Sequence, residues 1–320
     1  MKTFLEEVAE NVFRDHPKLE NATVIFPNRR AALYFRKHLT ALISKPVFAP
    51  RILTIEDFFR SLSRAKVPDK LILISILFRS YRDVLNAFPD DGDSEKIRRL
   101  EEFYFWGEML LRDFEEVDKY LVPAEQLFKD LSHQKELDAS FDFLTEEQKT
   151  FLKEFWSNFD VTPSANKGRF LRMWRRLSHV YQRFRSDLAK NGLAYEGMLQ
   201  REVAESLGQR SSGIDITGHL VFAGFNALTA AEEKLITHCV DKYNATVYWD
   251  VDAYYLNNRW QEAGMFFREY QQKPILDKTF PVDIPSHFQE KIASGKEVHL
   301  YSASQPIGQA KLMSQVLKTG

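Results

Sequence analysis

Residues Ala22–Arg36 read ATVIFPNRRAALYFR. The β-branched and apolar run Thr23–Phe26 predicts a short buried strand. The pattern from Arg29 to Ile43 predicts a helix that carries basic residues on one face. A short apolar strand followed directly by a helix is typical of a parallel sheet, in which helices form the connections between strands.

The same strand-then-helix order recurs along the chain. Four more short strands are predicted: Arg51–Thr54, Leu220–Ala223, Thr246–Trp249 and Val298–Tyr301. The helices predicted to follow them are Glu56–Ser63, Ala230–Tyr243, Gln261–Tyr270 and Gly308–Lys318. We therefore expect an α/β fold with five parallel strands and right-handed crossovers.

A long helical region interrupts this order. The roughly 150 residues between the second and third strands carry almost no strand pattern, and they far exceed an ordinary connection. The helices predicted there are Lys70–Phe88, Glu95–Glu116, Ala124–His133, Thr145–Asn158, Lys167–Lys190 and Tyr195–Leu207. The expected domains are an α/β domain formed by residues 1–66 and 209–320, and an all-α insertion domain formed by residues 67–208.

The composition is that of a globular protein without a strong overall charge. The chain has 320 residues, of which 44% are apolar and 28% charged, as in globular proteins. Its net charge of −1 means that any nucleic-acid contact must come from local basic patches. The single cysteine, Cys239, excludes an internal disulfide and reads as a packed thiol in a helix. The eight histidines show no ligand spacing, so the sequence predicts no metal site.

Two expectations concern the cellular location of the protein and the length of the full polypeptide. The first residues lack the features of a signal peptide, and no apolar run approaches the ~18 residues of a membrane span. We therefore expect a cytoplasmic protein with no membrane partner. Residues Lys296–Gly320 read as a strand, a turn and a helix with no strand after them, so we also expect the chain to be the front part of a longer polypeptide.

The segment after the first strand is the leading candidate for a site. Open parallel sheets bind ligands at the carboxyl ends of their strands, where Pro27 and Asn28 lie. Asn28 is suited to cap the next helix, whose first amides attract anions. Arg29, Arg30 and Arg36, with the adjacent lysine, would supply charge for DNA phosphates. The alternative interpretation is a solvated basic face whose arginine stems cover apolar surface.

Two other strand ends are candidate sites. Thr54 is a good N-cap, and Asp57 lies three positions later, as in a capping box; a DNA contact from Thr54 is the alternative interpretation. The third strand ends in Ala223 and Gly224, where a motor ATPase needs an acid to hold Mg²⁺. Glu232 and Glu233 come later and are explained by the start of a helix.

The chain also lacks the glycine-rich loop with lysine and Ser/Thr that would bind a triphosphate. Because both parts of an ATP site are missing from the sequence, no cofactor is predicted in this chain. Asp250 and Asp252 would suit a metal only if the fourth strand continued through them, and we favour a turn at the end of that strand.

The predicted helix Lys167–Lys190 carries many basic residues, among them Arg172, Arg175 and Arg176. These residues suit a track for a nucleic-acid backbone. The alternative is that they lie on a solvated face and pair with the acidic stretch Asp113–Asp118. The sequence does not separate these two interpretations.

The order of motifs resembles the N-terminal part of AddB-type subunits of bacterial helicase–nucleases, relatives of superfamily 1 helicases with a PD-(D/E)xK nuclease. The matching stretches, in the order of that family, are VIFPNRRAALYFRKHL, RILTIEDFF, EEFYFWGEMLLRDFEEVDKYL, GLAYEGMLQREV, LVFAGFNALTAAEEKLI, VYWDVDAYY and EAGMFFREY. They run over most of the chain.

The resemblance implies a RecA-like helicase domain with a helical side domain. It places VIFPNRR where a helicase strand contacts single-stranded DNA, and VFAGF where Mg²⁺ is bound. It further implies an AddA-like helicase subunit as a partner, and a C-terminal nuclease that is not found in these 320 residues. Because the phosphate loop is missing and Ala223 replaces the acid, the chain departs from the members that use ATP.

Three hypotheses follow. The first is a non-hydrolysing helicase-like module that binds a single strand or a duplex end and positions it for the nuclease in DNA repair or recombination. The second is a protein-interaction scaffold that docks a partner helicase without touching DNA. The third, an active ATPase with a divergent phosphate site, is the least favoured.

Overall fold

The computed structural model describes residues 2–87, 99–124, 127, 163–208, 218–281 and 299–319. The chain divides into two compact units. The first unit comprises Met1–Asp250 and Lys273–Thr279, and the second comprises Val251–Gln272 and Phe280–Gly320.

The first unit contains a four-stranded sheet in the order β2-β1-β3-β4, and every pair of neighbouring strands is parallel. The strands are β1 (Ala22–Phe26), β2 (Arg51–Thr54), β3 (His219–Phe225) and β4 (Thr246–Trp249). The predicted α/β class, the parallel pairing and four of the five predicted strands are therefore confirmed. Because all strands run the same way, their carboxyl ends lie at one edge of the sheet.

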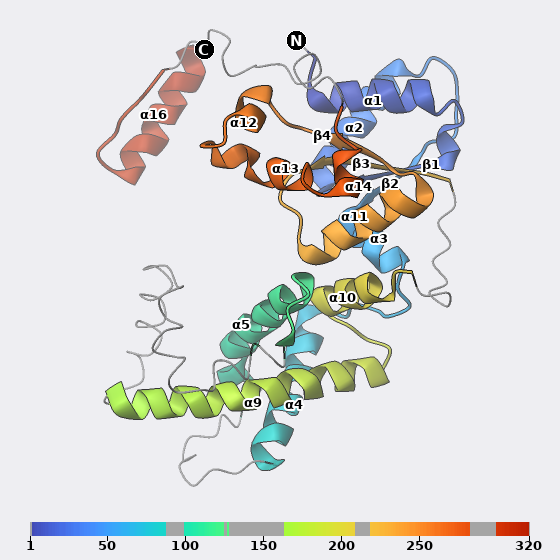
Figure 1. Ribbon diagram of the computed structural model, residues 1–320. Coiled ribbons are helices and arrows are strands. Elements are labelled where there is room, and N and C mark those ends of the chain that lie inside the picture. The colour runs from blue at the N-terminus through green and yellow to red at the C-terminus, as the bar shows by residue number, and fades with distance from the viewer. Residues whose placement is uncertain are drawn as a thin grey trace. The chain divides into compact units, whose positions relative to one another are not determined.

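Helices cover both faces of this sheet (Figure 1). The helices α1 (Phe4–Asp15) and α2 (Arg29–Leu42) lie on one face, and α3 (Ile55–Ser61) and α11 (Ala230–Tyr243) lie on the other. Val24 and Phe26 of β1 belong to the same buried core as Val12 of α1 and Phe35 of α2. On the opposite face Phe222 of β3 meets Phe58 of α3, with ring centroids 5.9 Å apart. Most strand residues are apolar because helices cover both faces of the sheet.

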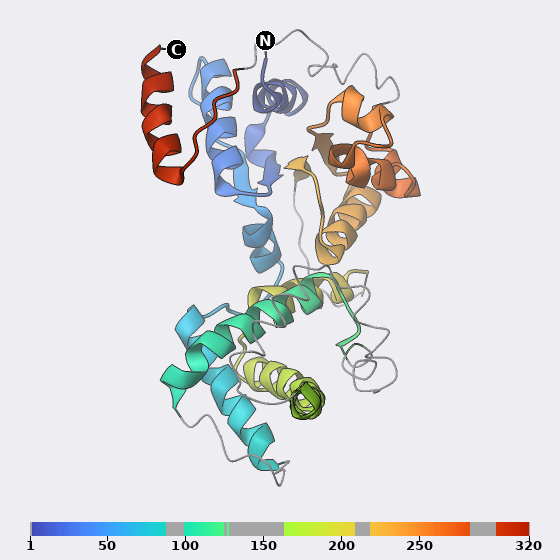
Figure 2. The same cartoon turned by 90° about the vertical axis from the view of Figure 1, so that its left-hand side faces the viewer.

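After α3, four more described helices precede β3 in the chain: α4 (Lys70–Ala87), α5 (Leu100–Lys119), α9 (Pro163–Lys190) and α10 (Glu196–Ser206). They pack against one another, and α10 also packs against α3 and α11 (Figure 2). Gly197 permits the close approach of α10 to α5, because a Cβ atom there would lie 2.5 Å from the Glu115 carbonyl oxygen. The helical character predicted for this region is confirmed in its described part.

A buried carboxylate joins three of these helices. Asp118 of α5 is 0% exposed, and it accepts hydrogen bonds from the hydroxyls of Tyr181 (2.5 Å) and Tyr195. Arg185 of α9 lies 3.1 Å from Asp118, and Arg201 of α10 lies 2.6 Å from it. Burial and the neighbouring carboxylate raise the pKa of Tyr181 to about 12. The tyrosines therefore remain neutral donors to this carboxylate.

The second unit contains α12 (Ala253–Asn257), η3 (Glu262–Gly264), α13 (Met265–Tyr270) and α16 (Pro306–Thr319). The predicted fifth strand, Val298–Tyr301, is wrong in its described part, because His299 to Tyr301 are irregular. Leu300 is 92% exposed there. An apolar run forms a strand only beside a hydrogen-bonding neighbour, and no described strand lies next to this one.

Some predictions are left open. The division of the chain at residues 67 and 208 stays a prediction, as does the identity of the helical region as an insertion domain. The predicted helix Thr145–Asn158 and nearly all of Ala124–His133 lie outside the described residues.

The short helix α14 (Pro274–Asp277) belongs to the first unit, where it packs against α11.

Candidate nucleic-acid interface

The first residues of α2 lie at the carboxyl edge of the sheet, directly after β1. Asn28 is the N-cap, and its Oδ1 accepts a hydrogen bond of 3.0 Å from the Ala31 amide. The predicted capping role of Asn28 is therefore confirmed. Arg29 and Arg30 occupy the first turn and are both exposed. This turn contains no acidic residue, so its positive end is not neutralised by its own side chains.

The outer face of α2 carries basic residues and no acids. The helix sequence RRAALYFRKHLTAL contains no Asp or Glu. Its core side is formed by Phe35 and Leu39, which leaves Arg29, Arg30, Arg36 and Lys37 exposed. We call these four residues the α2 basic face. None of the ion pairs formed among the described residues includes any of the four, so their charges are directed to solvent.

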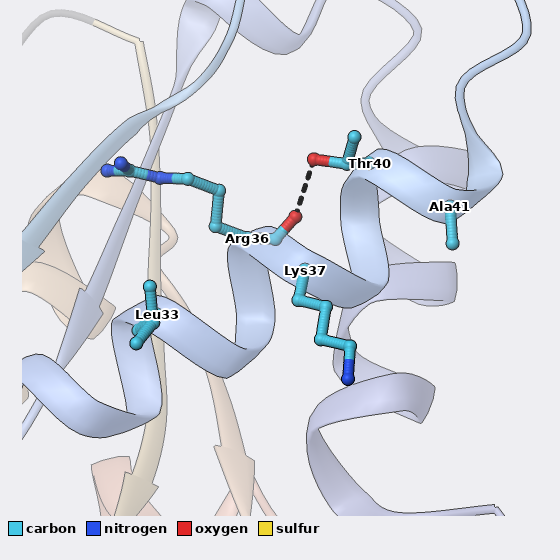
Figure 3. A pocket seen from close by; sticks show the side chains of 5 residues that line it. All are labelled: Leu33, Arg36, Lys37, Thr40 and Ala41. Carbon is cyan, nitrogen blue, oxygen red and sulfur yellow. Dashed lines mark hydrogen bonds between the residues drawn. The ribbon is translucent and has the colours of Figure 1, made fainter.

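A shallow cavity of about 500 Å³ runs along part of this helix. Its described lining residues are Leu33, Arg36, Lys37, Thr40 and Ala41. Figure 3 shows the Arg36 guanidinium and the Lys37 ammonium pointing in different directions, while the Thr40 hydroxyl donates a 2.7 Å hydrogen bond to the Arg36 carbonyl. Cations that diverge in this way suit a series of separate phosphates better than one small anion.

Sequence reasoning missed the apolar residues between these cations. Leu33 is 65% exposed and Tyr34 is 49% exposed, although both lie among the charges of the α2 basic face. The sequence contained this information. Phe35 marks the buried side of the helix, and residues next to it in sequence lie on other faces. Exposed aromatic and apolar side chains between cations are compatible with stacking of unpaired bases, and also with a protein contact.

Thr54 lies at the same edge of the sheet, since it pairs in register with Phe26. Its side chain is buried and caps α3: the hydroxyl accepts from the Asp57 amide (3.1 Å) and donates to Asp57 Oδ2 (2.8 Å). The predicted N-cap is confirmed, although the Asp57 carboxylate holds the Thr54 hydroxyl and forms no reciprocal capping box. The DNA contact considered for Thr54 stays a prediction, and we do not include it in the interface.

The third strand ends without an acid, at Ala223 and Gly224. Gly224 has a φ of +77°, and a Cβ atom there would lie 3.4 Å from the Phe4 ring at the start of α1. The first turn of α1 therefore lies beside the end of β3. A capping box between Thr3 and Glu6 uses donors of this turn, which also carries Glu7. Two carboxylates at this point oppose the binding of a phosphate.

Glu232 has the structural role expected for it. Its Oε2 accepts a 2.9 Å hydrogen bond from the Thr229 amide, and the Thr229 hydroxyl accepts from the Glu232 amide. Burial raises the pKa of Glu232 despite these hydrogen bonds. The capping box at the start of α11 accounts for this acid without a metal or a nucleotide.

The basic residues of α9 differ from those of α2. Arg183 lies 2.8 Å from Asp83 and 2.9 Å from Asp187, and Arg185 is paired with the buried Asp118. The predicted pairing with the stretch Asp113–Asp118 is therefore confirmed for Arg185. Arg176 is partly exposed, while the side chains of Arg172 and Arg175 lie outside the described residues. A DNA contact by these three arginines stays a prediction.

The two aspartates after β4 lie beyond the end of the strand, as predicted. The strand ends at Trp249, so it does not continue through Asp252. Asp252 instead caps α12, with Oδ1 accepting from the Tyr254 amide at 2.9 Å. Within the described ranges, no group of three or more His, Cys, Asp or Glu residues is arranged to hold a metal ion.

Comparison with known proteins gives no further identification. No protein-family model matches this sequence, and no curated protein matches it significantly. Among the described helices, none has the length and apolar character needed to cross a membrane.

Proposed function

We propose that this chain is a helicase-like module that binds DNA through the α2 basic face and does not hydrolyse ATP. In this proposal the sheet is part of a RecA-like domain, and the helices between β2 and β3 form an insertion in it. The module holds a single strand or a duplex end and positions it for a nuclease of the AddB type. An AddA-like helicase subunit is its expected partner.

One observation carries the proposal. Four cations lie on the outer face of a helix without acids, which begins at the carboxyl edge of a parallel sheet, and none is paired with a described acid. Unpaired surface charges retain their full attraction for phosphates, whereas charges already paired with carboxylates lose much of it. The paired arginines of α9 show that elsewhere in this chain basic side chains do find acidic partners.

The RecA-like assignment rests on topology and on the order of motifs. The strand order β2-β1-β3-β4 is compatible with part of such a sheet. The absence of ATP chemistry is supported by the sequence, which has no phosphate loop, and by the acidic, capped first turn of α1 beside Gly224. A site that lacks both the cradle and the Mg²⁺ ligand cannot stabilise phosphoryl transfer.

The proposal is tested by replacing two charges on α2. Fluorescence anisotropy of a labelled oligothymidylate is measured across a series of salt concentrations for the wild type and for the Arg29→Gln/Arg30→Gln variant. We expect the double substitution to weaken binding at every salt concentration. It should also lower the slope of log affinity against log salt by about 0.7 for each phosphate contact that is lost.

The matched control is Arg183→Gln, which removes one exposed charge that is already held by Asp83 and Asp187. It should leave both the affinity and the salt slope nearly unchanged. Wild-type binding that is absent, or that responds equally to the control and the double variant, would contradict the proposal.

A second function, docking of a partner helicase, is favoured by one specific observation. Leu33 is 65% exposed on the outer side of α2, and Phe48 in the connection to β2 is 79% exposed. Exposed apolar side chains of this size are enriched at protein interfaces. A pull-down of the partner helicase in the absence of DNA, lost on Leu33→Asp/Phe48→Asp but retained by the Arg29→Gln/Arg30→Gln variant, would support this function.

A further inference from the structure

A short segment of the second unit presents an arginine and a tryptophan to solvent. Arg259 and Trp260 lie between α12 and η3, and the Trp260 side chain is 79% exposed. The Arg259 guanidinium lies over the indole ring, 4.7 Å from its centroid. Trp260 makes no other ring contact among the described residues. A large aromatic side chain that is left in water and held by one cation is unusual, because burying it would stabilise the fold.

The half-buried Arg268 holds the backbone of this segment through hydrogen bonds. The guanidinium of Arg268 on α13 donates hydrogen bonds to the carbonyl oxygens of four residues: Tyr255 (2.6 Å), Asn258 (3.2 Å), Arg259 (3.4 Å) and Gln261 (2.9 Å). Asn258 Oδ1 also accepts from the Trp260 amide at 3.1 Å. The tryptophan is therefore carried by a segment whose conformation is set before any ligand arrives, which lowers the entropic cost of binding.

Gly264 allows η3 to lie close to the end of α12. A Cβ atom at Gly264 would lie 2.1 Å from the Tyr255 carbonyl oxygen, one of the four that Arg268 holds. Only glycine permits this close approach of η3 to the end of α12. Arg268 and Gly264 therefore both hold this segment close to α12 and η3.

From this arrangement we infer that Arg259 and Trp260 form a stacking platform for an unpaired base of single-stranded nucleic acid. The free face of the indole accepts the base, and Arg259 steadies the ring from its other face and reaches the neighbouring phosphate. The platform is a second contact, independent of α2. The inference rests on the proposed function, because it takes DNA as the ligand of the chain.

The surroundings of Trp260 favour a base over a protein partner. A protein hot spot is enclosed by apolar contacts that exclude water. Here the neighbouring residues in sequence are polar, namely Asn257, Asn258, Gln261 and Glu262. A base needs only a flat ring on one side and a cation near its phosphate, and both are present.

The test uses the whole chain and oligothymidylate of sufficient length to occupy more than one contact. Trp260→Ala should weaken binding roughly tenfold, within the range for loss of one stacked base, and should leave the salt slope unchanged. Arg259→Gln should instead lower the salt slope by about 0.7, because it removes one phosphate contact. Trp260→Phe, which keeps an aromatic face, should restore much of the lost affinity.

Phe105→Ala is the matched control, since Phe105 is 70% exposed on α5 and no cation of the described residues lies over its ring. If the wild type binds DNA and Trp260→Ala binds as tightly as the control, the platform is overturned while the proposed function stands, and Trp260 is then open to a protein partner. If the wild type does not bind DNA at all, both fail. Binding that depends on Trp260 but not on Arg29 and Arg30 supports the platform and contradicts the role of α2.

Discussion

At the scale of single residues, His16 lies where its protonation is disfavoured in the folded chain. Its ring lies edge-on to that of His219, with centroids 4.4 Å apart, beside a pocket that Asp15 and Lys18 also line. Burial, and then the charge of His219, lower the pKa of His16, while Asp15 acts in the opposite direction. The folded chain therefore binds a proton at His16 less readily than the unfolded chain does.

The sign of the pH dependence follows from this difference. Above its ordinary pKa, His16 is neutral in the folded and the unfolded chain, so it does not lower the free energy of unfolding. This free energy falls as the pH falls through the lowered pKa that His16 has in the folded chain. We expect His16→Gln to make the free energy of unfolding fall less steeply between pH 7 and pH 5, as measured by urea unfolding at a series of pH values. His38→Gln, at a position without a neighbouring imidazole among the described residues, should retain the wild-type pH dependence. Parallel curves for His16→Gln and the wild type would rule this account out.

Local residue patterns were predictable because their physics is local. The caps at Asn28 and Thr54 bond to amides only three residues later, so a short window of sequence contains both partners. The buried thiol of Cys239 was likewise evident from its helical neighbours, and burial raises its pKa to about 12. The exposed Trp260 was not foreseen, since nothing in its sequence reveals that Arg268 fixes the segment around it.

At the scale of elements, the Asp118 cluster links α5, α9 and α10. Asp118 is 0% exposed and faces two arginines and two tyrosine hydroxyls. Replacing it by Asn leaves Arg185 and Arg201 without a compensating charge, and removing one partner of a buried pair typically costs about 3–5 kcal/mol. We expect Asp118→Asn to lower the free energy of unfolding by an amount in this range, measured by urea unfolding.

Asp83→Asn provides the comparison, because Asp83 is paired with Arg183 at the surface and its side chain is 42% exposed. Its loss should cost less than about 1 kcal/mol. Equal effects of the two substitutions would show that the buried cluster contributes no more to stability than an exposed ion pair.

Elements differ in how far the sequence predicts them. Thr23–Phe26 and Thr246–Trp249 were found as strands because their apolar and β-branched residues suit a sheet buried on both faces. Val298–Tyr301 carries a similar pattern but no described strand pairs with it, so the pattern alone was insufficient. The partners of Asp118 could not be predicted, because the chain brings together residues from three separate helices only when it folds.

At the scale of the whole molecule, we propose a framework like that of a motor domain and a surface for DNA, without the groups that use ATP. The framework is the parallel sheet with helices on both faces, and the surface is the α2 basic face. The acids near the sheet edge, Glu6 and Glu232, serve as helix caps. DNA binding should therefore be independent of nucleotide.

The most direct measurement is an oligothymidylate titration of the whole chain at low salt, with and without Mg²⁺ and ATP, in which released phosphate is followed in the same samples. We predict binding that weakens as salt rises, the same affinity in the presence and absence of ATP, and no release of phosphate above that of a protein-free sample. An affinity that changes with ATP, ATP hydrolysis that is stimulated by DNA, or no DNA binding at all would contradict the account.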